Sequence, residues 1–288
     1  MLRLDCHERR ARRRSGGDRS PAPHVEAHPR HRGARRRDRG LARGRERLLP
    51  ADPGRGAGRS RGGAVRIALV RHGQASAHRD DYDQLSDKGF EQARALGLAW
   101  RNEGRVVSRL VRGPRRRHRE TTEAFLETFG EPIEVEVDDA LDEHQGVMLT
   151  RLLFDDLVDR EDDLGSLARD ARDLKGGIQS FLPLFRRVMR HWSHGELDHP
   201  EVESYRLFRG RVEQCVAGLH PGGDGWAVAI TSGGTVGAAV AGALGLGDTH
   251  GVDLMFSVQN ASVSELNARG LFRFNCVGHL PPALRTFI

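Results

Sequence analysis

Apolar runs of two kinds, alternating and continuous, recur along the chain with helical patterns between them. Their lengths and β-branched residues predict strands. The expected strands cover residues 66–70, 106–111, 133–137, 226–231, 262–266 and 271–277. The run at 226–231 (WAVAIT) is continuous, which favours a central strand buried on both faces. Strands that alternate with helices predict an α/β fold whose sheet is mostly parallel.

Helical periodicity fills the intervals between these strands. Ser86 has the chemistry of an N-cap for a helix with one apolar face. The residues of that face are Phe90, Ala93, Leu96, Gly97 and Trp100. A second helix is expected at 118–129, closed by Gly130, and a helix of small residues at 234–247.

No strand pattern occurs between residues 150 and 220, so a helical insertion is expected at about 150–200. Apolar stripes predict helices at 180–192 and 204–219, and we interpret both stripes as core packing. Pro183 is compatible with the first helix if Ser180 caps it, because proline then lies in the first turn. Arginines on this insertion either face an anionic substrate or belong to an exposed helical surface. They are Arg151, Arg186, Arg187 and Arg190.

Charge divides the chain into a basic tail and a mildly acidic body. Residues 1–65 carry 19 Lys and Arg against 7 Asp and Glu, whereas the remainder carries 27 against 33. The tail, residues 1–64, is rich in Arg, Gly and Pro and has few apolar residues, which predicts disorder. Three interpretations stay open: a start assigned too far upstream, an idle tail, or a nucleic-acid or polyanion arm. The absence of aromatic residues for base stacking weakens the last one.

Three cysteines without metal-ligand spacing, Cys6, Cys215 and Cys276, predict a reducing, cytoplasmic location. No segment resembles a signal peptide, and the longest apolar run is about half a membrane span. The body, residues 65–288, is therefore expected to form one domain without membrane contact.

The first predicted strand runs directly into two basic side chains, Arg71 and His72, and then into a glycine. The carboxyl ends of strands are where open α/β sheets bind their ligands. Arg71 and His72 at such an end predict an anion site.

Four ordered segments resemble those of the histidine phosphatase superfamily, which includes the cofactor-dependent phosphoglycerate mutases. They are LVRHGQAS, YDQLSDKGFEQARALG, RGPRRRHRETTEAF and ALDEHQG, and the resemblance covers about residues 65–282. It implies a three-layer α/β fold with a mostly parallel sheet flanked by helices. It also implies that Arg117 and Glu143 accompany Arg71 and His72 in the site.

The resemblance implies a role for each of these side chains. His72, in its neutral form, attacks phosphorus and becomes phosphohistidine. Arg71 and Arg117 hold the phosphoryl oxygens with paired donors. Glu143 protonates the leaving oxygen and then activates water. Neither a metal nor a cofactor is implied, because the two arginines supply the positive charge.

One segment departs from the family pattern. The family usually reads Ser-His-Gly-Gly late in the chain, and the matching stretch here is ITSGGTVGAA, with Ser232 at the position of the second histidine. Ser232 can donate one hydrogen bond but carries no charge. The backbone of Gly233 and Gly234, at the start of a helix, is expected to add anion affinity. Ser232 is alternatively a plain N-cap, and His78, His144 and His279 are weighed as replacements.

Two classes of function remain for the body. The first is a phosphomonoester hydrolase that acts on a small phosphorylated substrate through phosphohistidine at His72. The second is a phosphate-binding module with little or no turnover. Mutase activity is disfavoured, because no residues are evident that would protect a phosphoenzyme from water. The substrate and the oligomeric state do not follow from the sequence.

Overall fold

The fold is known from a computed structural model, which describes residues 66–76, 83–172, 178–221 and 223–287. These residues all belong to one structural unit, Gly58–Ile288. Expectations for the tail, residues 1–64, and for Cys6 and His78 lie outside the described residues. Within those residues, no helix has both the length and the apolar character needed to cross a membrane.

The described part of the chain forms one six-stranded sheet in the order β3-β2-β4-β1-β5-β6. The strands are β1 (Arg66–Arg71), β2 (Val107–Arg112), β3 (Val135–Val137), β4 (Trp226–Thr231), β5 (Val263–Asn267) and β6 (Gly270–Cys276). The first four strands pair in parallel, and β5 and β6 are antiparallel. The predicted mostly parallel sheet with a closing strand pair is confirmed.

Nine α-helices lie in the described residues. They are α1 (Asp87–Asn102), α2 (Arg116–Phe129), α3 (Gly146–Leu152), α4 (Phe154–Val158), α5 (Asp163–Arg172), α6 (Ile178–Ser193), α7 (Tyr205–Gly218), α8 (Gly233–Ala243) and α9 (Asp248–Met255). Two short 3₁₀ helices cover Asp139–Leu141 and Pro282–Leu284. The helices α4, α5 and α6 lie within residues 150–200, where the sequence predicts a helical insertion.

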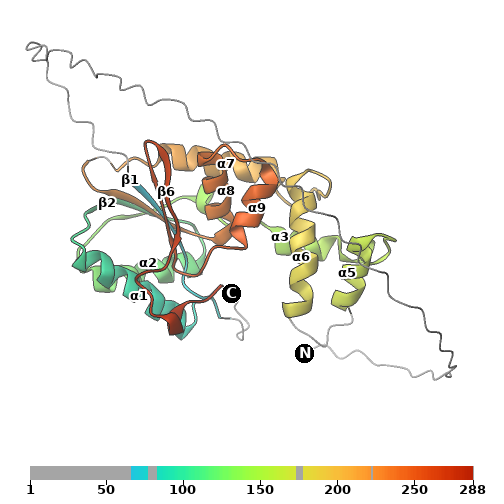
Figure 1. The fold of residues 1–288 in the computed structure, drawn as a ribbon, viewed down its shortest axis with the longest axis horizontal. Helices are drawn as coiled ribbons and strands as arrows, with labels where there is room; N and C mark the ends of the chain where they lie inside the picture. The colour runs from blue at the N-terminus through green and yellow to red at the C-terminus, as the bar shows by residue number, and fades with distance from the viewer. Residues whose placement is uncertain (1–65, 77–82, 173–177, 222, 288) are drawn as a thin grey trace, which may run out of the picture. The chain divides into compact units, whose positions relative to one another are not determined.

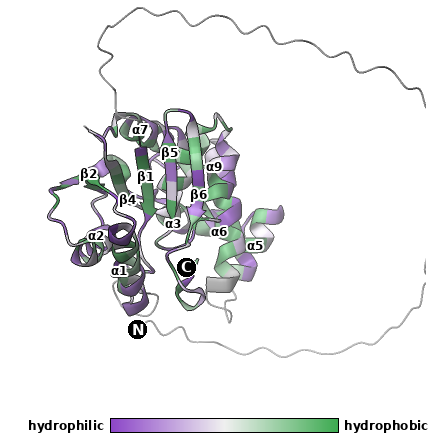
Figure 2. Ribbon diagram, turned by 60° about the vertical axis from the view of Figure 1, so that its left-hand side comes forward, coloured by the Kyte–Doolittle hydropathy of each residue, from purple (hydrophilic) through white to green (hydrophobic). Residues whose placement is uncertain are grey.

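The sheet separates two layers of helices, which confirms the three-layer architecture (Figure 1). Ala68 and Val70 of β1 pack with the apolar faces of α1 and α2. Ile67 and Leu69, on the opposite face of the same strand, pack with the core built by α7, α8 and α9. This alternation follows from the period-2 geometry of a strand. The hydrophobic colour of β1 and β4 in Figure 2 reflects their burial between the two layers.

Several predicted element boundaries are confirmed. Ser86 caps α1, and its hydroxyl accepts a hydrogen bond from the Gly89 N–H at 3.1 Å. The helix α2 ends at Gly130, which adopts the left-handed conformation. Ser204 caps α7, whose apolar stripe is buried as expected. The strand β4 is central, and its residues Ala227–Thr231 are all buried.

Three boundaries differ from the expectations. The alternating run 133–137 forms only the three-residue edge strand β3, because a single neighbour, β2, is available to pair with it. The small-residue helix stops at Ala243, and a separate helix, α9, follows. Pro183 lies inside α6 and not in its first turn, since that helix begins at Ile178 and Ser180 is therefore not its cap.

Candidate active site

His72 follows the last residue of β1 and is 5% exposed. Its backbone N–H donates to the Thr231 carbonyl at 2.8 Å, so the residue lies beside the end of β4. The ring Nδ1 lies 2.6 Å from the Gly73 carbonyl oxygen and donates its proton to it. In a neutral imidazole, this contact leaves Nε2 without a proton. Nε2 is therefore the nucleophilic nitrogen of this ring.

The protonation state of His72 supports the same conclusion. Burial, followed by the positive charges of Arg117 and Arg71, holds the pKa of His72 well below 6.5. Desolvation and nearby cations both disfavour the charged imidazolium. His72 is therefore a neutral base at pH 7, with two guanidinium groups close enough to influence its titration.

Arg71 is the last residue of β1, and the final segment of the chain anchors its guanidinium. Its Nη1 donates to the carbonyl of Phe287 at 2.7 Å and also to the carbonyl of Val258. A Cβ built on Gly233, at the start of α8, would lie 3.5 Å from Arg71 Nε. The first glycine of α8 and Arg71 are thus in contact, which places the two predicted phosphate ligands side by side.

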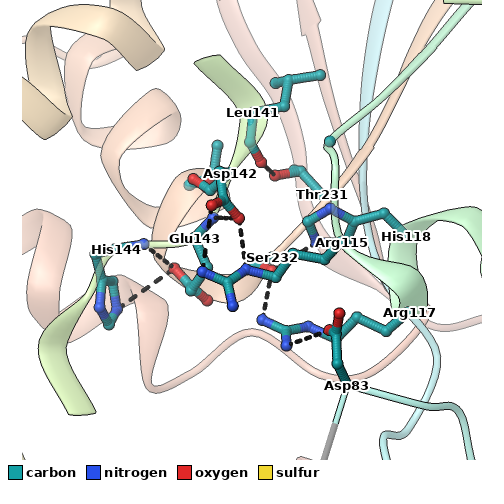
Figure 3. A network of polar contacts seen from close by, with 12 residues as sticks. Asp83, Arg115, Arg117, His118, Leu141, Asp142, Glu143, His144, Thr231 and Ser232 are labelled. Atoms are coloured by element: carbon teal, nitrogen blue, oxygen red, sulfur yellow. Dashed lines mark hydrogen bonds and ion pairs between the residues drawn. The ribbon is translucent and has the colours of Figure 1, made fainter. Parts of the chain in front are cut away.

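Arg117 enters the site from the first turn of α2, and its side chain is only 7% exposed. Its Nη1 donates to Asp83 Oδ1 at 2.9 Å, and its Nη2 donates to Ser232 Oγ at 3.3 Å (Figure 3). Its Nε is buried and has no hydrogen-bond partner in the structure. A buried guanidinium N–H without an acceptor is costly, and an anion beside it would remove that cost.

Ser232 occupies the N-cap position of α8, but its side chain makes no capping hydrogen bond. Its hydroxyl instead contacts Arg117 and His118, with 2.7 Å between Oγ and His118 Nε2 (Figure 3). The serine is fully buried. Its side chain is thus turned toward the cationic part of the site, which an N-cap role alone does not explain.

Glu143 approaches the same helix from the loop between the first 3₁₀ helix and α3. Its Oε2 accepts from the Gly234 N–H at 3.4 Å, and its Oε1 accepts from the His144 N–H at 3.1 Å. A Cβ on Gly234 would lie 2.2 Å from Oε1, so only glycine permits this approach. Of the two glycines expected to offer their N–H groups to an anion, Gly234 thus donates to this carboxylate.

The carboxyl group of Glu143 is ionised in this arrangement. Burial opposes ionisation, but His144, Arg117 and the backbone N–H groups of Gly234 and His144 outweigh it and lower the pKa of Glu143. A phosphate dianion in the site would raise that pKa again, because like charges disfavour the ionised form. The resting carboxylate suits a base, and protonation for acid catalysis has to accompany substrate binding.

Two threonines hold the loop that carries Glu143. Thr231 Oγ1 donates to the Leu141 carbonyl at 2.6 Å, and Thr235 Oγ1 donates to the Asp142 carbonyl at 3.0 Å. Both threonines are fully buried. They flank Ser232 in sequence, so the same strand-to-helix turn positions both Ser232 and the loop of Glu143.

His144 and His279, two of the candidate replacements for a second catalytic histidine, lie in the described residues. Neither occupies that position. His144 is buried among the rings of Phe185, Trp192 and Phe208, and its Nε2 lies 3.4 Å from Glu143 Oε1. Burial is the main cause that lowers the pKa of His279 to about 4, so this residue is uncharged at pH 7. His78 lies outside the described residues.

Three residues of the site were not singled out from the sequence. Asp83 pairs with Arg117, and His118 contacts Ser232. Gln92 accepts from the Gln74 N–H at 2.8 Å and donates to the Leu284 carbonyl at 2.6 Å, which joins the loop after His72 to the final segment. Gln92 is the glutamine of the segment YDQLSDKGFEQARALG, which carries part of the family resemblance, whereas the only sequence signal for His118 is a polar residue within a helix of otherwise ordinary pattern.

Comparison with known protein families gives a match. The family model for the histidine phosphatase superfamily (branch 1) matches residues 67–194, which include His72, Arg117 and Glu143. The predicted resemblance to the histidine phosphatase superfamily is confirmed over these residues.

Solved structures share the fold of this chain. A mycobacterial glucosyl-3-phosphoglycerate phosphatase in complex with inorganic phosphate is 22% identical, with a TM-score of 0.50, and the match covers 76% of this chain and 100% of that one. A putative alpha-ribazole-5'-P phosphatase from Escherichia coli str. K-12 substr. MG1655 is 19% identical, with a TM-score of 0.50, and the match covers 74% and 97%.

YhfR from Bacillus stearothermophilus is 18% identical, with a TM-score of 0.52, and the match covers 74% of this chain and 98% of that one. At these identities the likeness concerns the fold. No curated protein matches the chain by sequence.

Contacts within the described residues account for three of the arginines named in the insertion. Arg187 pairs with Asp163, and Arg190 pairs with Asp253. Arg186 lies over the ring of Phe256, 4.7 Å from its centroid. For these three residues, the interpretation as an exposed helical surface explains the contacts without a substrate.

Proposed function

We propose that the protein hydrolyses a small phosphate monoester through a phosphohistidine at His72. One observation carries this proposal: the imidazole is buried and neutral, and Nδ1 is bound to the Gly73 carbonyl, which leaves Nε2 free to attack. Arg71 and Arg117 lie near enough to lower the pKa of that imidazole. A guanidinium offers paired donors that fit phosphoryl oxygens.

The reaction has two steps. In the first, His72 Nε2 bonds to phosphorus while the ester P–O bond breaks, and the leaving oxygen takes a proton from Glu143. In the second, water attacks phosphorus, the P–N bond breaks, and Glu143 takes the proton of the water. Each well-placed donor to the phosphoryl oxygens is worth about 2.7 to 4 kcal/mol in the transition state.

The test is formation of a phosphoenzyme from a generic aryl phosphate. We expect an acid-labile label on His72 that is absent in His72→Ala, and release of phosphate in the presence of a chelator. Orthovanadate, which mimics five-coordinate phosphorus, should bind to the wild type. Arg117→Ala should weaken that binding, whereas Arg109→Ala should not, because the Arg109 guanidinium contacts Glu136 and the Gly218 carbonyl and none of the proposed site residues.

The second candidate is a phosphate-binding module with little turnover, and Ser232 favours it because a serine cannot carry charge. It predicts vanadate binding without any label on His72. A metal requirement for either effect would contradict both candidates. Cytoplasmic location and polyanion binding by residues 1–64 stay predictions from composition alone.

A further inference from the structure

His118 is a buried polar residue next to the proposed nucleophile that the reaction above leaves without a role. It lies in the first turn of α2, is fully buried, and its ring centroid is 5.8 Å from that of His72. Its Nε2 lies 2.7 Å from Ser232 Oγ, and its Nδ1 has no hydrogen-bond partner in the structure. A buried imidazole at this place requires an explanation, because burial without full hydrogen bonding is costly.

The chain makes room for this imidazole. A Cβ built on Gly113 would lie 2.3 Å from His118 Nδ1, so a side chain at position 113 would exclude the ring from its site. Burial, followed by the charges of Arg117 and Arg115, holds the pKa of His118 well below 6.5. His118 is therefore neutral at pH 7 and carries one ring proton, and the relay proposed below requires that proton on Nε2.

The hydroxyl of Ser232 has two neighbours, and one of them can only donate. Arg117 Nη2 donates to Ser232 Oγ, because a guanidinium has no acceptor. A phosphoryl oxygen in the site can only accept. Once a phosphoryl group is bound, Ser232 completes the arrangement by donating its own proton to that group and accepting from His118 Nε2–H. Two donors to one hydroxyl oxygen strengthen the bond that the hydroxyl itself donates.

We propose that His118 is a positioning residue that directs the Ser232 hydroxyl proton onto the phosphoryl group. Ser232 and His72 lie close together because of the strand register. Thr231 of β4 pairs with Arg71 of β1, and the next residue of each strand leaves the sheet at the same edge. This inference rests on the proposed function. It assigns to His118 of α2 and to Ser232, the N-cap residue of α8, a neutral donor relay toward the phosphoryl group.

A double-mutant cycle on His118 and Ser232 tests the relay. The readout is the single-turnover rate of His72 phosphorylation by an aryl phosphate, with orthovanadate affinity measured in parallel. We expect His118→Ala to lower the rate about tenfold, as loss of one oriented donor to a charged group does. In the Ser232→Ala background, His118→Ala should change the rate no further.

Two further variants separate positioning from packing. His118→Gln retains a side-chain N–H and should recover most of the rate. Thr122→Val, one turn along the same helix, removes a buried hydroxyl that bonds only to the His118 carbonyl and should leave the rate unchanged. Additive losses in the cycle, or a wild-type rate in His118→Ala, would overturn the relay.

The outcome also distinguishes this inference from the proposed function. If the wild type binds orthophosphate but is never labelled at His72, the hydrolase proposal is wrong. The same double-mutant cycle, with orthophosphate affinity as the readout, then still tests the relay. A wild type that binds neither orthophosphate nor vanadate overturns both. If His72 is phosphorylated and the substitutions of His118 and Ser232 affect the rate independently, the hydrolase proposal stands and the relay proposal is wrong.

Discussion

Gly234 and Glu143 meet at the start of α8, where the N–H of one donates to the carboxylate of the other at 3.4 Å. There is no space for a side chain between them, because a Cβ on Gly234 would lie 2.2 Å from Glu143 Oε1 and 2.3 Å from His144 Cδ2. The position of the proposed acid–base group is therefore set by a backbone atom of the neighbouring helix.

Gly234→Ala is expected to displace Glu143 and to lower turnover about a hundredfold, as a misplacement of about 1 Å does elsewhere. The measurement is steady-state hydrolysis of an aryl phosphate, with thermal unfolding recorded for the same variant. Gly242→Ala is the matched control in the same helix, since the atoms nearest to its Cβ would belong to the Glu213 side chain. Unchanged turnover in Gly234→Ala would show that this contact does not position the carboxylate.

Ser232→His alone is expected to destabilise the protein. The position is fully buried, and His118 Nε2 already lies 2.7 Å from Ser232 Oγ, so a second imidazole would overlap the first. The exchange Ser232→His with His118→Ala supplies the space. We expect the double variant to unfold at a higher temperature than Ser232→His and to hydrolyse an aryl phosphate at least as fast as the wild type. A double variant no more stable than Ser232→His would argue against overlap of the two rings.

Asp83→Asn is expected to strengthen phosphate binding severalfold. Asp83 neutralises part of the charge of Arg117 through a 2.9 Å contact, and the amide removes that negative charge from a partly buried position. Asparagine can still accept from the Arg116 N–H, which Asp83 Oδ2 binds at 2.8 Å, so the start of α2 is retained. Calorimetric titration with orthophosphate measures the effect, with Asp253→Asn as the control from an exposed pair. Weaker binding would mean that Asp83 orients Arg117 more than it opposes the anion.

Stability is expected to fall as pH decreases from 7 toward 5. The pKa values of His72, His118 and His144 lie below 6.5 in the folded protein, mainly through burial, and that of His279 is lowered to about 4. The unfolded chain takes up protons near pH 6.5 that the folded protein does not. The free energy of unfolding therefore decreases by up to roughly 1.4 kcal/mol per pH unit for each histidine.

Urea unfolding at pH 7.5 and 5.5 measures this slope. The lowered pKa of Glu143 acts in the same direction, but only near and below 4.5, outside this range. His118→Gln should reduce the slope by about one histidine's share. Equal stability at both pH values would show that these imidazoles are not kept neutral by folding.

The sequence was most informative where one short segment carries both the structure and the chemistry. The pattern of β1 predicts Arg71 and His72 at the end of a strand, and the family resemblance singled out Ser232, which follows β4 at the same edge of the sheet. Arg117 and Glu143 came from the family resemblance, and the structure brings both into contact with the start of α8 or its cap.

Other features depend on partners far away in the sequence. Gln92 lies on the buried face of α1 because of acceptors 192 and 194 residues later, and no local pattern encodes that. His118 is compatible with an ordinary helix, and only its contacts with Ser232 and Gly113 in the structure indicate a role for it. The early start of α6 was missed because proline inside a helix is disfavoured locally and is tolerated here by packing of the adjacent apolar stripe.

The anchoring of Arg71 and Gln92 on the final segment has a practical consequence. The carbonyls of Phe287 and Leu284 and the hydroxyl of Thr286 hold side chains that adjoin the nucleophile loop. An affinity tag fused after residue 288 would begin two positions after Phe287, whose carbonyl accepts from Arg71, a proposed phosphate ligand. An amino-terminal tag that is removed before the assay leaves these contacts unchanged. A carboxy-terminal fusion is expected to disturb them and to lower activity without any change in the reaction itself.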